Sequence, residues 1–277
     1  MKSFKTLEEQ LEMLKKKNIV VNSDGEAMEF LSRENYYNII NGYKDLFLVK
    51  DKLKKVKNTE EFVEGTNFEH LKCIFLFDRE LRSIFLKYLL VFENHFKTIL
   101  SYEFSKKYPE RDSYLDRENF YDDKKEVLNV FVSLSRTLKD KMEIDGPVKH
   151  YMNEHGYVPL WVFVNYLTLG NVSHFYKILK PKDKEIICRR FSENYNKNYQ
   201  PIVRFKMEDT FLVSGIKIFN IIRNVCAHDE RLYNIKFSNT KVIKLEKILE
   251  FKYLNNYKLI AAIVYMKPEF RNLAQDF

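Results

Sequence analysis

Arg223, Asn224 and His228 lie close together in the sequence and carry the groups needed to process a phosphodiester. A histidine side chain has a reference pKa of about 6.5, so it takes up or releases a proton near neutral pH. An arginine stays charged, and its guanidinium group binds phosphate oxygens in a forked geometry. An asparagine amide can hold an imidazole in one tautomer or bind a ribose hydroxyl.

RNA cleavage needs these three roles. The 2′-hydroxyl loses a proton and attacks the adjacent phosphorus, the extra negative charge is stabilised, and the 5′-oxygen leaves with a proton. The nucleophile belongs to the RNA itself, so the reaction requires no metal in principle. The residues also have a structural interpretation, because Arg and His near a helix end often cap carbonyls or pair with carboxylates. An Arg-x4-His spacing is common by chance, so spacing alone favours the structural interpretation.

The polar residues follow an apolar pattern that predicts a buried helix over about residues 205–227. Its apolar positions include Ile216, Phe219, Ile222 and Cys226. On a regular helix Asn224 and His228 share a face, whereas Arg223 and His228 lie roughly 140° apart. That arc is wide for one small substrate. We therefore expect either a groove shared with a second copy of the chain or a helix that ends or bends near Ala227.

Residues 223–234 resemble the signature of the Abi-like (AbiD/AbiF) abortive-infection proteins, whose core is a HEPN ribonuclease domain. The HEPN motif is Arg, then a polar residue that is often Asn, then His after four to six intervening positions, and here four intervene. Residues 6–47, 78–102 and 159–171 also resemble the family, in the same order along the chain. Matching motifs there are Asn35-Tyr36-Tyr37, Arg79-Glu80-Leu81-Arg82 and Pro159-Leu160-Trp161.

The resemblance implies a composite active site at the interface of a homodimer, where the motif meets its symmetry mate. His228 would act as general acid or base, Arg223 would stabilise charge on the phosphate, and Asn224 would orient the histidine or the ribose. Glu93 would face the motif helix and orient Arg223 or His228. Arg231 and Asn234 match the family's extension and would bind RNA phosphate or brace the dimer.

The implied biology is that of a dormant toxin in a toxin–antitoxin arrangement, which cleaves RNA after phage infection and shuts down the host. A small non-coding RNA or another antidote would restrain it. Two other functions fit the same sequence. One is a non-catalytic RNA-binding HEPN module that holds a structured RNA, and the other is a helical protein-interaction scaffold whose motif only closes the fold.

Composition predicts an all-α protein. The 277 residues are 45% hydrophobic and include only seven Gly and six Pro, which favours long helices over many turns. The resemblance implies a HEPN-type helical bundle, which we expect over residues 61–277 with an N-terminal helical extension over residues 1–60, or as one continuous domain. The net charge of +8 favours a polyanionic partner, although mild basicity alone discriminates little.

Three distant cysteines without a Cys-x-x-Cys pair indicate a reducing compartment. The chain starts without an apolar signal core, and its longest apolar run, residues 259–266, is far shorter than the ~20 residues of a membrane helix. These features predict a soluble cytoplasmic protein with no membrane partner. His150 and His155 are wrongly spaced for two ligands on one helix face, so we expect no metal and no cofactor.

The apolar periodicity predicts a series of helices and no strands. The expected helices span residues 7–17, 26–32, 36–47, 67–107, 127–142, 147–155, 159–167, 172–179, 182–191, 205–227 and 240–267. Residues 67–107 form either one long helix or two helices joined by a bend near Asp78. We expect a basic connection over residues 49–61, a turn at Gly170-Asn171 and a loop over residues 192–200.

Three smaller features complete the predictions. Glu93 and Lys97, four residues apart, would form a surface ion pair worth a few tenths of a kcal/mol. Trp161 is the only tryptophan, and its apolar neighbours predict that it is buried. Arg189 and Arg190 would contact phosphate or, with more weight, form a solvated face.

Overall fold

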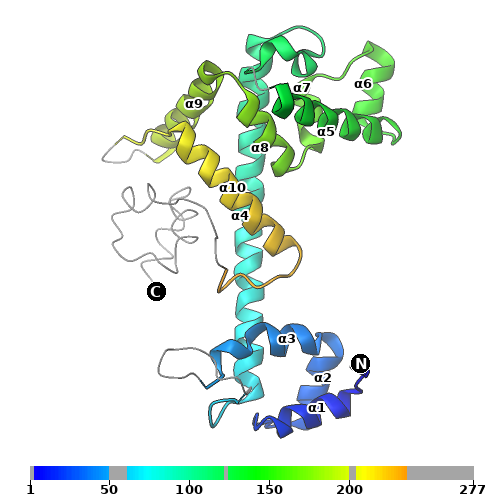
Figure 1. The fold of residues 1–277 in the computed structure, drawn as a ribbon, viewed down its shortest axis with the longest axis vertical. Coiled ribbons are helices and arrows are strands. Elements are labelled where there is room, and N and C mark those ends of the chain that lie inside the picture. The colour runs from blue at the N-terminus through cyan, green and yellow to red at the C-terminus, as the bar shows by residue number, and fades with distance from the viewer. Residues whose placement is uncertain (1–2, 50–60, 122–123, 200–203, 236–277) are drawn as a thin grey trace. The chain divides into compact units, whose positions relative to one another are not determined.

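The computed structural model describes residues 3–49, 61–121, 124–199 and 204–235 (Figure 1). These residues form ten α-helices, four short 3-10 helices and no strand, which confirms the all-α prediction. Contacts divide the described residues into two compact units. Unit 1 is Met1–Ile84 with Val225–Ile235, and unit 2 is Phe85–Asn224.

Unit 1 begins with three short helices. They are α1 (Leu7–Lys16), α2 (Asp24–Arg33) and α3 (Tyr36–Tyr43). Thr6 and Glu9 form the capping box that starts α1, because each side chain accepts a hydrogen bond from the other's backbone N–H. The Ser23 side chain accepts from the N–H of Glu26, so α2 starts at Asp24, two residues before the predicted helix.

The core of unit 1 is built around aromatic side chains on α2, α3 and the start of α4 (Phe68–Lys107). The rings of Phe30 and Tyr43 both pack edge-on against Phe75, at 6.1 and 5.8 Å between centroids. Aliphatic residues such as Leu14 and Ile39 fill the space around them. This packing fixes the first turns of α4 in unit 1.

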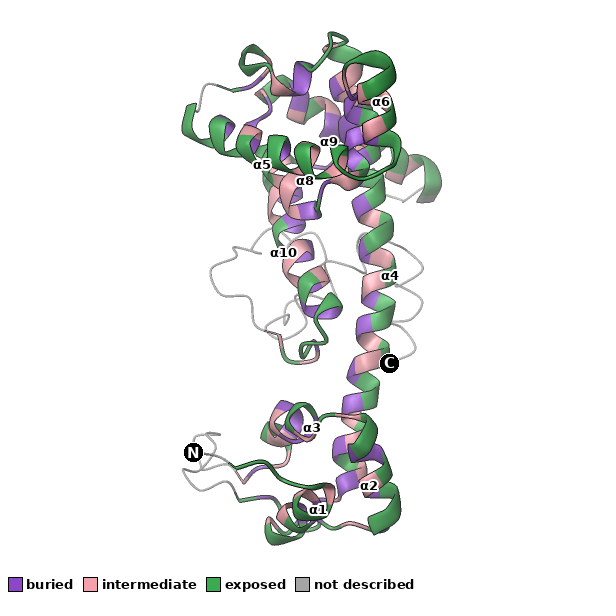
Figure 2. Ribbon diagram, turned by 90° about the vertical axis from the view of Figure 1, so that its right-hand side faces the viewer, coloured by how far each residue is buried: buried purple, intermediate pink, exposed green. Residues whose placement is uncertain are grey.

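Helix α4 is one continuous helix of 40 residues, so the alternative of two helices with a bend near Asp78 is wrong. Buried positions recur along it at helical intervals, including Phe85, Leu89, Phe96 and Leu100 (Figure 2). The stretch contains no proline or glycine that would break the backbone hydrogen bonds.

Unit 2 adds six helices to the second part of α4. They are α5 (Lys124–Met142), α6 (Pro147–His155), α7 (Leu160–Phe163), α8 (Leu169–Ile178), α9 (Pro181–Tyr199) and α10 (Asp209–Ala227). Phe104 and Phe120 both pack against Phe175 of α8, and Phe92 of α4 meets Phe219 of α10 edge-on at 4.7 Å.

Two sequence predictions in unit 2 are wrong, and in both places a polar side chain binds the backbone. Gly170 and Asn171 lie inside α8 rather than in a turn, because Thr168 and Asn171 form a capping box at the start of that helix. The polar residues 192–200 continue α9 to Tyr199 instead of forming a loop. Asn196 of α9 binds both the N–H and the carbonyl of Phe205, each at 2.8 Å.

That contact also corrects the start of the motif helix. Residues 205–208 run along α9 without helical structure, so α10 begins at Asp209 rather than at residue 205. The backbone N–H of Met207 donates to the Ser192 hydroxyl at 2.8 Å, which holds the segment in place. The predicted helix over 240–267, most of the basic connection over 49–61 and the domain boundary at residue 60 fall outside the described residues.

Candidate functional site

Helix α10 ends at Ala227, which confirms the predicted end of the motif helix. Asp229 takes the left-handed conformation, with φ of 56°, and the N–H of Glu230 donates to the carbonyl of Val225 at 3.0 Å. These two features define a Schellman cap with Asp229 in the position usually taken by glycine. His228 is therefore the capping residue at the helix end, and its side chain is exposed to solvent.

The chain that follows His228 is fixed by the carboxylate of Asp78 on α4. This carboxylate is fully buried and accepts the backbone N–H groups of Leu232 and Tyr233, at 3.0 and 2.7 Å. It also accepts the hydroxyl of Tyr43 at 2.8 Å and Nη1 of Arg82 at 2.9 Å. Four donors thus satisfy one buried carboxylate, which holds residues 232 and 233 against α4.

Arg82 connects the same carboxylate to the residue after His228. Its Nη2 donates to Asp229, and only 3% of Arg82 is exposed. Burial alone lowers the pKa of Arg82, but the hydrogen bond with Tyr43 and the charges of Asp229 and Asp78 outweigh burial and raise it. Arg82 therefore stays charged, and it links the side chain of Asp229 to the carboxylate that binds the backbone of residues 232 and 233. We call Asp78, Arg82, Tyr43 and Asp229 the α4 clamp.

Burial in the same region affects two further groups. It raises the pKa of the Tyr43 hydroxyl, and the hydrogen bond to Asp78 raises it further, so Tyr43 stays a hydrogen-bond donor. It also raises the pKa of the Cys226 thiol to about 12. Cys226 is therefore a protonated core side chain and not a nucleophile.

Arg231 and Asn234 follow the clamp. Nη1 of Arg231 donates to the carbonyl of Gly42 at 2.6 Å and lies 3.8 Å from Asp45. Arg231 therefore braces its own chain within unit 1, while part of its side chain remains exposed. Asn234 is exposed. Binding of RNA phosphate or bracing of a dimer by these residues stays a prediction.

Arg223 and Asn224 are the last residues of α10 that belong to unit 2. The structure brings the two side chains together, with Nη1 of Arg223 donating to Oδ1 of Asn224 at 3.4 Å. The distance is long for a hydrogen bond, and among the described residues the guanidinium group of Arg223 has no other partner. His228 belongs to unit 1.

Glu93 pairs with Lys97 at 2.7 Å, as its spacing predicts, but the pair is buried and not on the surface. Glu93 is 7% exposed, and among the described residues its second oxygen, Oε2, has no hydrogen-bond partner. A buried carboxylate oxygen without a donor is costly, and such atoms call for an explanation. The predicted role of Glu93 toward Arg223 or His228 stays a prediction.

The sequence patterns did not predict Asp78 as part of the site. They included Arg82 only as the last residue of the Arg79-Glu80-Leu81-Arg82 motif that resembles the family. A signal was nevertheless present, because Asp78 and Arg82 are four residues apart on a helix face whose other members, such as Phe75 and Phe85, are apolar. Opposite charges at core positions predict a buried pair with a specific task.

A family model described as Abi-like protein matches residues 29–234. The chain belongs to the Abi-like protein family. The match includes every residue of the α4 clamp and every predicted site residue, and it ends at Asn234. No curated protein and no solved structure matches the chain. The family connects this chain with abortive infection, a form of phage defence.

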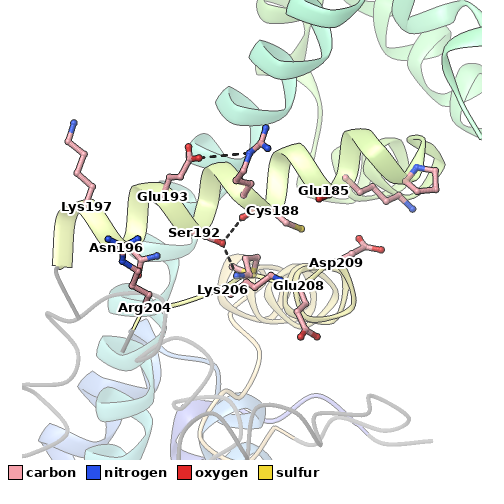
Figure 3. Close-up of a pocket in the computed structure, with 14 residues that line it drawn as sticks. Glu185, Cys188, Ser192, Glu193, Asn196, Lys197, Arg204, Lys206, Glu208 and Asp209 are labelled. Atoms are coloured by element: carbon pink, nitrogen blue, oxygen red, sulfur yellow. Dashed lines mark hydrogen bonds and ion pairs between the residues drawn. The ribbon is translucent and has the colours of Figure 1, made fainter. Parts of the chain in front are cut away.

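A large hollow of this Abi-like chain lies elsewhere, between α9 and the start of α10 (Figure 3). It has a volume of about 1110 Å³, and its lining contains five lysine or arginine and four glutamate or aspartate side chains. Arg189 in the lining is 3.9 Å from Glu193, and the neighbouring Arg190 pairs with Glu103 at 2.5 Å. The mixed charge does not favour a polyanion. Arg189 lines this hollow, but none of Arg223, Asn224, His228, Glu93, Arg231 and Asn234 does.

Two further properties of the Abi-like chain concern metals and membranes. Within its described part, no group of three or more His, Cys, Asp or Glu side chains is arranged to hold a metal ion. Helix α10 is the one described helix long and apolar enough to cross a membrane by length and composition. This is weak evidence for a span, because a core helix has the same properties and α10 buries Ile218 and Ile222 in the protein.

Proposed function

We propose that this Abi-like protein is a metal-independent endoribonuclease of the HEPN type that acts as a toxin in phage defence. The observation that carries the proposal is the placement of His228. Its imidazole is exposed at the end of α10, and the residue that follows it is held by Arg82 of the α4 clamp. An exposed histidine on a fixed backbone is suited to proton transfer with a bound substrate.

In the proposed reaction His228 accepts the proton of the 2′-hydroxyl or donates a proton to the departing 5′-oxygen. Such transfer typically contributes a factor of about 10²–10⁴ to the rate. Arg223 stabilises the negative charge that develops on the phosphate as the 2′-oxygen attacks. Asn224, which already bonds Arg223, orients the guanidinium group, the imidazole or the ribose.

The reaction requires a base for the nucleophile and an acid for the leaving group, and each chain supplies one motif histidine. A homodimer would supply two copies of His228 and so both proton carriers. A second copy would also bring a second Arg223 to the same phosphate. The proposal therefore includes a homodimer. It also places the protein in the cytoplasm, where a small RNA or another antidote restrains it.

Two single substitutions test the proposal. Arg223→Ala and His228→Ala should each abolish cleavage of RNA, while the His228 variant keeps its fold and its affinity for RNA. His155→Ala, which removes an exposed histidine outside the motif, is the matched control and should cleave normally.

Other outcomes assign the other functions. A protein that loses RNA affinity with Arg223→Ala, and never shows turnover, is an RNA-binding module. A protein that loses only stability with both substitutions, and has no effect on RNA, is a scaffold. Either result contradicts the ribonuclease proposal.

A further inference from the structure

The only tryptophan of the chain lies on the surface. Trp161 on α7 is 55% exposed, so the prediction that it is buried is wrong. Its helix has only four residues, and the neighbouring Leu160 and Phe163 take the buried positions instead. An exposed Trp presents a large apolar ring to solvent, and such rings are common in binding sites.

Trp161 borders a second hollow, which lies within unit 2 and has a volume of about 490 Å³. One wall is the face of α4 that carries four positions at helical spacing. They are Thr98, Ser101, Tyr102 and Ser105. The opposite wall consists of Trp161, Val164 and Asn165. We call this hollow the Trp161–Tyr102 hollow.

The second aromatic ring of the hollow is also exposed, since Tyr102 is 56% accessible. Val164 is buried and adds an apolar side chain to the lining. Two exposed rings from separate elements border one hollow, which is an arrangement that can receive a flat aromatic ligand by stacking. A volume of 490 Å³ falls in the range of small-molecule sites.

The charge of the hollow indicates an anionic ligand. Lys106 is its one charged lining residue, and the other polar residues of the lining are neutral hydroxyls and the amide of Asn165. The amide nitrogen of Asn165 already donates to the carbonyls of Trp161 and Val162, both at 3.2 Å. Its carbonyl oxygen therefore remains as an acceptor toward a ligand. The hollow between α9 and the start of α10, in contrast, has four carboxylates in its lining.

We propose that the Trp161–Tyr102 hollow binds an unpaired base of single-stranded RNA. The base stacks on Trp161 and Tyr102, and Lys106 contacts an adjacent phosphate. Flat rings and a cation without a competing carboxylate are the two features that bind single-stranded nucleic acid without strong sequence preference. The identity of the ligand as RNA rests on the proposed function, whereas the stacking site rests on the geometry of the hollow.

The single tryptophan makes a direct test possible. All protein for the test carries His228→Ala, so that the RNA stays intact during the titration. The probe is a ten-nucleotide oligouridine, and the readout is the fluorescence of Trp161. We expect saturable quenching by the single strand and none by the same strand hybridised to oligoadenosine, because a base in a duplex cannot stack on the protein.

Substitutions measured with fluorescently labelled RNA complete the test. Trp161→Ala and Tyr102→Ala should each weaken binding about 5-fold to 150-fold, the range expected for loss of one base–aromatic stack. Trp161→Phe should restore most of the affinity, and Lys106→Ala should weaken binding while reducing its salt dependence. Tyr37→Ala is the matched control, because Tyr37 is an exposed aromatic residue on α3 outside the hollow.

Wild-type affinity in the Tyr102→Ala and Trp161→Ala proteins would overturn the stacking site, as would equal quenching by the duplex. These failures differ from failure of the ribonuclease proposal. Cleavage of RNA by the wild type, together with no change in Trp161 fluorescence in the His228→Ala protein, contradicts the stacking site alone. A protein whose Trp161 binds RNA, but which never cleaves it with His228 present, contradicts the ribonuclease proposal alone.

Discussion

Helix α4 carries two buried ion pairs with the same four-residue spacing, Asp78–Arg82 in unit 1 and Glu93–Lys97 in unit 2. Asp78 accepts four hydrogen bonds, and both of its oxygens are used. Glu93 accepts from Lys97 through Oε1, while Oε2 has no partner among the described residues. In the first pair every carboxylate oxygen is used in holding the fold. In the second pair one carboxylate oxygen can still accept a hydrogen bond, which a supporting role toward an arginine requires.

The largest effect should come from breaking the Asp78–Arg82 pair. Arg82→Met leaves Asp78 buried without its cation and should reduce the free energy of unfolding by about 3–5 kcal/mol. Urea unfolding measures this change. The matched control is Arg33→Met, which removes an ion pair with Glu29 whose side chains are both 67% exposed, and it should cost at most about 1 kcal/mol. Equal losses of stability from the two substitutions would show that the buried Asp78–Arg82 pair contributes no more than an exposed ion pair.

A smaller effect should follow from Glu93→Gln. The amide keeps a bond to Lys97 but leaves the ammonium buried without a counter-charge, so the free energy of unfolding should fall by about 1–3 kcal/mol. Adding Lys97→Met removes the unpaired charge and should bring stability back to within about 1 kcal/mol of the wild type.

The same double variant separates structure from function. If Glu93 supports Arg223, the Glu93→Gln/Lys97→Met protein remains stable but cleaves RNA more slowly than the wild type. Full activity in this stable protein would assign Glu93 a structural role alone.

The smallest effect concerns an ion pair between Arg79 of α4 and Glu34, the residue after α2. Nη1 and Nη2 of Arg79 each donate to the carboxylate of Glu34 at 2.6 Å. The hydrogen bonds from Arg79 lower the pKa of Glu34 below its ordinary value of 4.5. The pair therefore stabilises the fold above that value, and the contribution is lost as the pH falls through the lowered pKa. Because the pair is partly exposed, it should contribute about 1 kcal/mol or less.

Thermal unfolding of wild type and Glu34→Gln between pH 7 and pH 2 measures that contribution. The wild type should unfold at a higher temperature at pH 7, and the difference should shrink toward acid pH. A difference that does not depend on pH would mean that Glu34 acts through packing and not through its charge.

The sequence predicts much of this fold because most helices depend on local signals. The Thr6 capping box, the long uninterrupted pattern of α4 and the end of α10 near Ala227 are all readable from nearby residues. The errors arise where distant contacts decide. The side chain of Asn196 binds the backbone of Phe205, and residues 205–208 lie along α9, so α10 starts at Asp209 and not at residue 205. No local pattern in the sequence indicates that contact.

The candidate site shows the same division. Arg223, Asn224 and His228 follow from motif spacing, and so does the placement of His228 at a helix end. The clamp does not follow, because Asp78 reaches backbone groups more than 150 positions away in the sequence. The exposure of Trp161 was missed because periodicity does not tell which residues of a four-residue helix face the core.

The most direct test of the central claim is the chemistry of the RNA ends that the protein produces. Purified protein is incubated with cellular RNA in EDTA, beside the His228→Ala variant, and the fragment ends are analysed. We expect 2′,3′-cyclic phosphate ends from the wild type and no new ends from the variant. Cleavage that disappears in EDTA, or that persists unchanged in His228→Ala, would contradict the claim that His228 drives attack by the 2′-hydroxyl.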